Sequence, residues 1–162
     1  MPAQENLATA SSGAKVSLAT SYHPQYPAQN VIDGNSKTFW VTTGLYPQEL
    51  IVSLPKTVNL KRVAVTCTKV AHVTTEVSTA EKPAGFERLT DQDVEDTDQS
   101  FQMITPALPK SQVAARHIRF IFTKGHGPFV SVHKVVIYGG EIGSQTDTDE
   151  GAPLVLAADF LP

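Results

Sequence analysis

The segment 30–40 is a turn crowded with oxygen-bearing side chains, Asn30-Val31-Ile32-Asp33-Gly34-Asn35-Ser36-Lys37-Thr38-Phe39-Trp40. Calcium binds roughly six to eight oxygens from carboxylates, amides and backbone carbonyls, on a backbone that can curl around the ion. Asp33 offers a carboxylate here, and Gly34 permits a sharp turn because it has no Cβ. The pattern therefore indicates a candidate calcium loop. Further oxygens would come from Asn30, Asn35 and Thr38.

The same turn has a simpler interpretation, and the residues alone leave both open. Asp33 and Asn35 are residue types that commonly hydrogen-bond their own backbone in an Asx-turn, without any metal. One carboxylate is also little charge for calcium, so the affinity would depend on preorganised carbonyl oxygens. A second acid, Glu141, could complete the shell if the fold brings it near. Trp40, the only tryptophan, is expected to bury its ring beneath the loop.

The remaining polar clusters match no catalytic or metal motif. The acidic run 91–100 lacks the sixth-position glycine and the final glutamate of an EF-hand, so we expect a solvated loop. The five histidines show no H-x-x-x-H spacing, and Gly125-His126-Gly127-Pro128 fits no phosphate-binding loop. His117 and Asp33 could join a serine in a triad, but there is no G-x-S-x-G elbow. We therefore predict no catalytic residues and no enzymatic activity.

Short alternating runs indicate that the chain is built from β-strands. Apolar residues follow a period of two in runs separated by turn residues, at 15–20, 49–54, 58–69, 73–78, 116–123 and 130–138. We expect a strand end at Pro55, and Ile118, Phe120 and Phe122 should face one side together. Lys134 interrupts the last run, which predicts a bulge. With 11 prolines, 10 glycines and no helical stripe, the sequence predicts an all-β fold of roughly eight short strands, either a β-sandwich or a jelly roll.

Length and composition limit the chain to one domain with a tail. With 162 residues and a net charge of −3, it can bury one core and lacks the basic excess of nucleic-acid-binding proteins. No apolar window is long enough to span a membrane, and the N-terminus shows no secretory signal. Five acids and no lysine or arginine follow from Glu141 onward. We predict a jelly-roll domain over 1–141 and a disordered acidic tail over 142–162.

The single cysteine, Cys67, lies within an alternating apolar run. One cysteine cannot form a disulfide within the chain, and secreted β-rich domains of this size often contain one. We therefore expect Cys67 to be a small buried hydrophobic residue, and the protein to act inside the cell.

The turn at 30–40 also carries a family resemblance. Asn6-Leu7-Ala8, Tyr26-Pro27-Ala28-Gln29-Asn30-Val31-Ile32-Asp33-Gly34-Asn35 and Thr38-Phe39-Trp40 together resemble the opening of discoidin (factor V/VIII type C) domains. The resemblance covers about residues 1–140 and implies a galactose-binding-like jelly roll of eight strands. Members of that family commonly hold calcium in this loop. The resemblance therefore implies ligands at Asn30, Asp33 and Thr38, with Asn35 and Glu141 as weaker additions.

The resemblance is closer still to an intracellular branch of the family that serves in intraflagellar transport. It is carried by Ile32-Asp33-Gly34-Asn35, Thr38-Phe39-Trp40, Thr42-Thr43-Gly44, Pro47-Gln48-Glu49, Arg119-Phe120-Ile121 and Ser131-Val132-His133. This branch implies a non-enzymatic subunit of the intraflagellar transport B complex, located in the cilium or flagellum and the cytoplasm, with a structural calcium site. It also implies a heterodimer with a Rab-like small GTPase, intraflagellar transport protein 27, and contacts with other subunits of that complex. Candidates for the contact surface are His117, Arg119, Lys134 and the loop 125–129.

The alternative within the same fold is a lectin-like or lipid-binding discoidin module. Secreted members usually close the sandwich with a cysteine pair, which this chain cannot form. A sugar site would need an aromatic platform beside polar or cationic groups. The candidate aromatic residues are Tyr22, Tyr26, Tyr46 and Phe129.

Overall fold

The computed structural model of the chain describes residues 5–35, 37–97 and 100–142. Within these ranges the elements are η1 (Ala10–Ser12), β1 (Lys15–Ala19), η2 (Ala28–Ile32), β2 (Trp40–Val41), β3 (Gln48–Thr68), β4 (Val70–Ser78), β5 (Glu87–Asp93), β6 (Gln102–Ile104), β7 (Ala114–Gly125) and β8 (Ser131–Glu141), where η marks a short 3-10 helix. The all-β prediction is confirmed. In the same ranges, no helix has the length and apolar character needed to cross a membrane. The acidic tail predicted for 142–162 lies, from residue 143 onward, outside the described residues.

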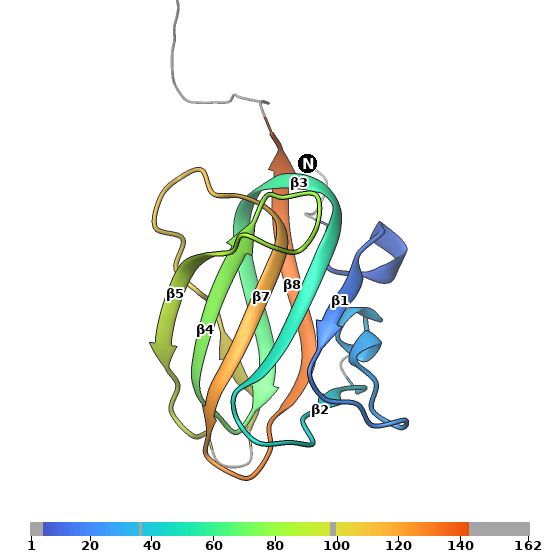
Figure 1. Cartoon of the computed structure of the whole chain (residues 1–162), viewed down its shortest axis with the longest axis vertical. Coiled ribbons are helices and arrows are strands. Elements are labelled where there is room, and N and C mark those ends of the chain that lie inside the picture. Colours follow the sequence, from blue (N-terminus) through green and yellow to red (C-terminus); the bar gives the residue numbers. More distant parts are fainter. Residues whose placement is uncertain (1–4, 36, 98–99, 143–162) are drawn as a thin grey trace, which may run out of the picture.

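The long strand β3 joins the two layers of a sandwich. Its first part, at 48–53, pairs with β1 and β7, and its last part, at 58–68, pairs with β8 and, near its end, with β6. Continued outward, these pairings give one layer in the order β1-β3-β7-β4-β5 and a second in the order β6-β3-β8-β2. All of these neighbours are antiparallel. β3 bends at one end of the molecule and so passes from one layer to the other (Figure 1). The prediction of an eight-stranded jelly roll is confirmed.

One sequence prediction about β3 is wrong. The run 49–54 predicts a strand end at Pro55, but β3 continues through this residue. Proline is tolerated here because Pro55 falls in the register break between Ser53 and Val58, where no ladder bond requires its missing N–H. The bend therefore lies where the pairing partners of β3 change.

The core lies between the two layers. Ile118, Phe120 and Phe122 of β7 are fully buried, as the alternation of that strand predicts. Trp40 of β2 is also fully buried, and its ring centroid lies 6.4 Å from that of Phe122. Aromatic side chains from the two layers therefore meet in one apolar cluster. The burial of Trp40 in this cluster holds the first residue of β2 in place.

The bulge predicted in β8 from the position of Lys134 is confirmed. The register between β3 and β8 skips His133, so that two residues of β8 face one position of β3. As a result, Val132 before the bulge and Val135 after it both point into the core and are fully buried.

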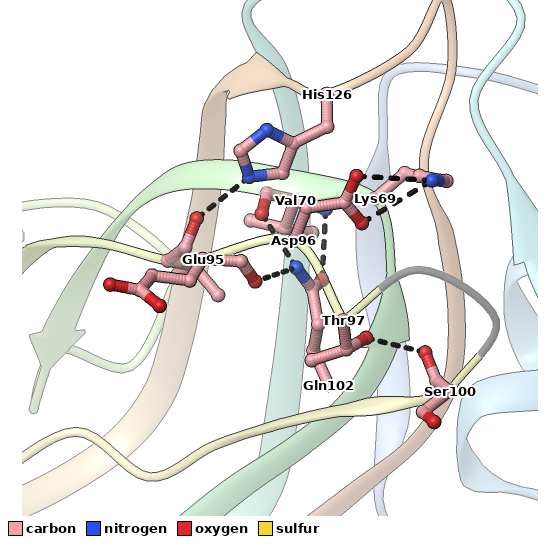
Figure 2. A network of polar contacts seen from close by, with 9 residues as sticks. Lys69, Val70, Glu95, Asp96, Thr97, Ser100, Gln102 and His126 are labelled. Carbon is pink, nitrogen blue, oxygen red and sulfur yellow. Dashed lines mark hydrogen bonds and ion pairs between the residues drawn. The ribbon is translucent and has the colours of Figure 1, made fainter.

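A buried amide side chain fixes the region where β3 turns into β4. Gln102 of β6 accepts a hydrogen bond at Oε1 from the backbone N–H of Val70 at 2.9 Å (Figure 2). Its Nε2 donates to the carbonyl oxygens of Val70 at 2.8 Å and Glu95 at 2.9 Å. Beside it, Lys69 Nζ forms an ion pair with Asp96 Oδ2 at 3.2 Å. The backbone after β5 is therefore fastened to the start of β4.

The described residues of the acidic run 91–100 are mostly exposed, as the sequence predicts, but the run is not simply a loop. Its first three residues complete β5, and the next ones contact Gln102, Lys69 and His126, whose Nε2 donates to Val94 O at 2.8 Å (Figure 2). Residues 98–99 lie outside the described ranges. The run itself contains no basic residue that could pair with its acids, so its local sequence could not indicate these contacts with distant residues.

Candidate functional site

The candidate calcium loop follows η2 and precedes β2, and both ends are fixed by burial. η2 buries Ala28, Val31 and Ile32. At the other end, the indole Nε1 of fully buried Trp40 donates to the carbonyl oxygen of Ser21 at 3.0 Å. The predicted burial of Trp40 is therefore confirmed, and both ends of the loop are held by buried residues.

The turn itself is made by two residues after η2. Asp33 has helical backbone angles, with φ −88° and ψ −3°, and Gly34 adopts a φ of 77°. A positive φ of this size costs glycine little, whereas residues with a side chain rarely adopt it. The sharp turn that the sequence predicts at Gly34 is thus present, and it directs the chain back toward η2.

Oxygen atoms from all four predicted ligand residues meet at the Thr38 hydroxyl. Its Oγ1 lies 2.6 Å from Asp33 Oδ2, 2.9 Å from the carbonyl oxygen of Asn35 and 3.5 Å from that of Asn30. A hydroxyl carries a single hydrogen, so it can donate to only one of these three acceptors at a time. The other two acceptors are then left without this hydrogen, and oxygens of these kinds are ligands that calcium takes.

The Asx-turn interpretation is also correct, and the two interpretations do not exclude each other. Asp33 Oδ1 accepts from the backbone N–H of Asn35 at 2.8 Å, and Asn35 Oδ1 accepts from that of Lys37 at 2.9 Å. Asp33 thus uses one carboxylate oxygen for the turn and directs the other toward Thr38. The Asn30 side chain donates from Nδ2 to Phe39 O at 2.8 Å, so Asn30 presents its backbone carbonyl rather than its amide oxygen to the cluster.

This donor set fits calcium in kind. It contains a carboxylate oxygen, a hydroxyl oxygen and two backbone carbonyl oxygens, all of which are hard ligands. Among the described residues, no group of three or more His, Cys, Asp or Glu side chains could hold a metal. A cation here would therefore depend on carbonyl and hydroxyl oxygens, with water completing its shell.

Glu141 does not complete the shell. It lies at the far end of β8, where its Oε1 pairs with Lys56 Nζ at 2.7 Å. Phe39, beside the loop, stacks on His133 near the start of the same strand, with ring centroids 4.9 Å apart. The eight residues from His133 to Glu141 rise about 26 Å along a strand. The expectation that Glu141 could complete the calcium shell is therefore wrong, because Glu141 and the loop lie at opposite ends of β8.

A row of rings borders the candidate loop, and the sequence did not reveal it. Tyr26 stacks on Phe39 with centroids 4.5 Å apart, Phe39 on His133, and Phe101 meets His133 edge-on at 4.7 Å. His23 contacts Tyr26 at 5.0 Å. The members come from four separate parts of the chain, so no local spacing could signal the row.

The four aromatic residues named for a sugar platform, all of which the structure describes, make no ring contact with one another. Tyr26 belongs to the ring row, and the Tyr46 hydroxyl donates to Gly127 O at 2.9 Å in a half-buried position. Tyr22 and Phe129 are exposed, at 73% and 51%. Two of the four therefore have structural contacts, and two remain on the surface.

The contact candidates differ in how accessible they are. His117 is buried: Ser53 Oγ lies 2.6 Å from its Nδ1, and its Nε2 donates to Ala80 O at 2.9 Å. Both ring nitrogens are used, and Asp33 is not among these partners, so the triad does not form. Arg119 donates from Nε to Glu76 Oε1 at 2.8 Å and lies 4.2 Å from the Phe86 ring centroid.

Cys67 is a core residue, as the sequence predicts. It is fully buried, and burial raises the pKa of its thiol to about 12. A thiol with so high a pKa supplies almost no thiolate at neutral pH, and the thiolate is the nucleophilic form.

Comparison with known proteins gives a consistent picture. A model of the F5/8 type C domain family matches residues 8–135. The intraflagellar transport protein 25 homolog of Homo sapiens is 35% identical over 134 residues, covering 83% of this chain and 92% of the human protein. Intraflagellar transport protein 25 of Chlamydomonas reinhardtii is 27% identical over 137 residues, covering 85% and 71% respectively. A carbohydrate-binding module of Clostridium perfringens, solved with GalNAc-β-1,3-galactose, superposes with a TM-score of 0.69 at 19% identity, covering 83% of this chain and all of the module.

Proposed function

Because this chain belongs to the F5/8 type C domain family and to the family of intraflagellar transport protein 25, we propose that it is a non-enzymatic subunit of the intraflagellar transport machinery in the cilium or flagellum. The observation that carries the proposal is the match along 92% of the human relative. At 19% identity, the likeness to the carbohydrate-binding module concerns the fold alone. Buried Cys67 and buried His117 are consistent with a protein that binds rather than catalyses.

The finer proposal is that the chain forms a heterodimer with a Rab-like small GTPase, intraflagellar transport protein 27, within the B complex. A stable contact of this kind buries on the order of 800 Å² on each partner. His117 cannot take part directly, because it is buried and both of its ring nitrogens are bound. Of the remaining candidates, the loop 125–129 presents the exposed ring of Phe129, the type of side chain that anchors protein interfaces.

We further propose that the loop binds calcium in a structural role. Asp33 would give its carboxylate, Thr38 its hydroxyl, and Asn30 and Asn35 their backbone carbonyls. Bound calcium would supply positive charge where these oxygens gather around the Thr38 hydroxyl. The loop leads directly into Phe39 and buried Trp40, so fixing it also fixes the ring row and the start of β2.

Affinity capture tests the partner proposal. Tagged protein is incubated with a ciliated-cell lysate in calcium, then in chelator, and bound proteins are identified by mass spectrometry. We expect a Rab-like GTPase together with other intraflagellar transport subunits. Phe129→Ser should weaken the capture, whereas Leu18→Ser, which changes an exposed residue on β1, serves as the matched control.

Three outcomes are informative: the first would overturn the proposed transport subunit, and the other two would locate the calcium site relative to the interface. Recovery of glycoproteins that free galactose releases, without a GTPase, would favour the lectin-like alternative over the transport subunit. Capture of the GTPase in both calcium and chelator would keep the heterodimer and place the calcium site away from the interface. Loss in chelator, reproduced by Asp33→Ala in calcium, would place the site at or beside the interface.

A further inference from the structure

His72 of β4 lies between two carboxylates of the neighbouring strand β5. Its Nδ1 is 2.7 Å from Asp93 Oδ1, and its Nε2 is 2.5 Å from Asp91 Oδ1. His72 and Asp93 are directly opposite in the β4–β5 register, and Asp91, two residues away, faces the same side of the sheet. The imidazole therefore spans the pair of acids and connects the two strands.

This geometry requires a proton on each ring nitrogen. Ionised carboxylates only accept hydrogen bonds, and a neutral imidazole donates from one nitrogen while the other carries a lone pair. Thr74 Oγ1 also donates to Asp91 Oδ1, at 2.7 Å. This hydroxyl and then His72 hold the pKa of Asp91 below its usual value, so that its carboxylate stays ionised. Only the imidazolium form of His72 satisfies both contacts.

The charged groups around His72 are two acids in contact with its ring and two cations, and the acids favour the imidazolium form. On β5 these are Asp93, Asp91 and Arg88, whose Nη1 lies 3.8 Å from Asp91 Oδ2. On β7 the residue opposite His72 is Lys124, which is exposed to solvent. The hydrogen bonds to Asp93 and Asp91 raise the pKa of His72 above its ordinary value. The ring is the group that lies directly between the two acids.

Strand β5 has few other contacts to hold it. Among the described strands it lies at the edge of its layer and pairs with β4 alone. Most of its residues are exposed and none is fully buried; Leu89, partly buried, packs against the core. A polar connection across the strand pair therefore matters more here than in the interior, where apolar burial dominates.

We propose that the protonation of His72 controls the attachment of β5 to β4. The imidazolium form holds the edge strand β5 on β4, and loss of its proton loosens that strand. The sign follows from linkage. A group whose pKa is raised on folding contributes stability that is complete below the unfolded pKa and is lost as pH rises through the folded pKa. Beyond β5, Glu95 O is still held by Gln102, so loosening is confined to the strand itself.

The test uses the full chain with labelled histidine. Nitrogen-15 NMR between about pH 5 and pH 9 gives the pKa of His72 and the protonation of each ring nitrogen. Hydrogen exchange, corrected for the intrinsic pH dependence, gives the protection of β5 amides relative to those of the interior strand β7. The variants are His72→Gln, the double change Asp91→Asn with Asp93→Asn, and His23→Gln as a control in the ring row.

We expect His72 to titrate above the ordinary value and to return toward it in the double variant or at high salt, because Asp93 is 91% exposed and open to screening. Protection of β5 should fall about tenfold for each unit by which the folded pKa exceeds the unfolded one. In His72→Gln this pH-dependent loss should disappear, while His23→Gln should keep it. An ordinary pKa for His72, or equal loss of protection in the parent chain and His72→Gln, would overturn the proposal.

Discussion

At the scale of single residues, Asp33 shows how one carboxylate can serve a turn and a binding site at once. Its Oδ1 accepts from the backbone N–H of Asn35, and its Oδ2 lies against the Thr38 hydroxyl. The turn holds the carboxylate in place, which reduces the ordering that a bound ion would otherwise impose. A site with one charge depends on such preorganisation of its neutral oxygens.

Asp33→Ala is expected to abolish the rise in melting temperature that calcium gives, while the sandwich stays folded. The residue is exposed, so without calcium the loss of its turn hydrogen bond should cost only about 1 kcal/mol of the free energy of unfolding. Thermal unfolding in calcium and in chelator measures both quantities. Glu81→Ala, an exposed acid outside the loop, is the control and should keep the calcium response. An unchanged calcium response in Asp33→Ala would refute the ligand assignment.

Cys67 should resist thiol reagents in the native protein. The thiol is fully buried and its pKa is raised to about 12, so at pH 8 almost none of it is thiolate. Labelling followed by absorbance should therefore become rapid only in denaturant. Phe129→Cys in a Cys67→Ala background places a thiol on the surface, where it should react at once. Rapid native labelling of the parent chain would contradict the burial of Cys67.

At the scale of elements, the connections are fixed by contacts between separate loops. The Tyr46 hydroxyl donates to Gly127 O, and the backbone N–H of His126 donates to Lys69 O at 2.8 Å. Gly125, at the end of β7, lies at this crossing, where the backbone approaches Tyr46 closely. Glycine is favoured at this position because a side chain would collide with Tyr46, and not because its backbone needs a positive φ.

Gly125→Ala and Gly127→Ala should therefore differ. A Cβ at 125 would lie within 1.9 Å of Tyr46 Oη and 3.1 Å of Lys69 O, so the Tyr46 hydroxyl must leave its hydrogen bond. We expect a loss of about 1–3 kcal/mol for Gly125→Ala. At 127 a Cβ meets nothing within 4 Å, and the change should stay within about 0.5 kcal/mol. Urea denaturation measures both values, and equal stabilities would argue against the close approach of Tyr46.

At the scale of the whole molecule, the sandwich has one contiguous core. The buried cluster begins at Ala8 and ends at Ile137, and it includes residues of both layers. The long strand β3 pairs with strands of both layers, so the two layers share one hydrogen-bonded element. The layers are therefore expected to unfold together rather than in separate steps.

A chain that ends at residue 142 should keep the stability of the full protein. Among the described residues, the buried core cluster lies between Ala8 and Ile137, within the domain predicted for 1–141. The melting temperature should agree within about 2 °C, since such a shift corresponds to less than about 1 kcal/mol. Thermal unfolding of both chains tests this. A much larger decrease would mean that the acidic tail contributes to the fold and would move the predicted domain boundary.

The sequence alone determined those features that depend on near neighbours in the chain. Alternation identified the β-rich body and the buried face of Ile118, Phe120 and Phe122, because side-chain direction repeats every two residues. Spacing within 30–40 predicted that Asp33 and Thr38 share one turn, because the two residues are only five positions apart and Gly34 between them permits the chain to reverse.

Only the tertiary structure decided which distant residues meet. It carried β3 through Pro55, separated Glu141 from the loop by the length of β8, and buried His117 against Ser53. It also placed His72 between two acids of β5. Each of these outcomes depends on strand order and register across long stretches of chain. Local periodicity fixes which side a residue faces but not which strand lies beside it.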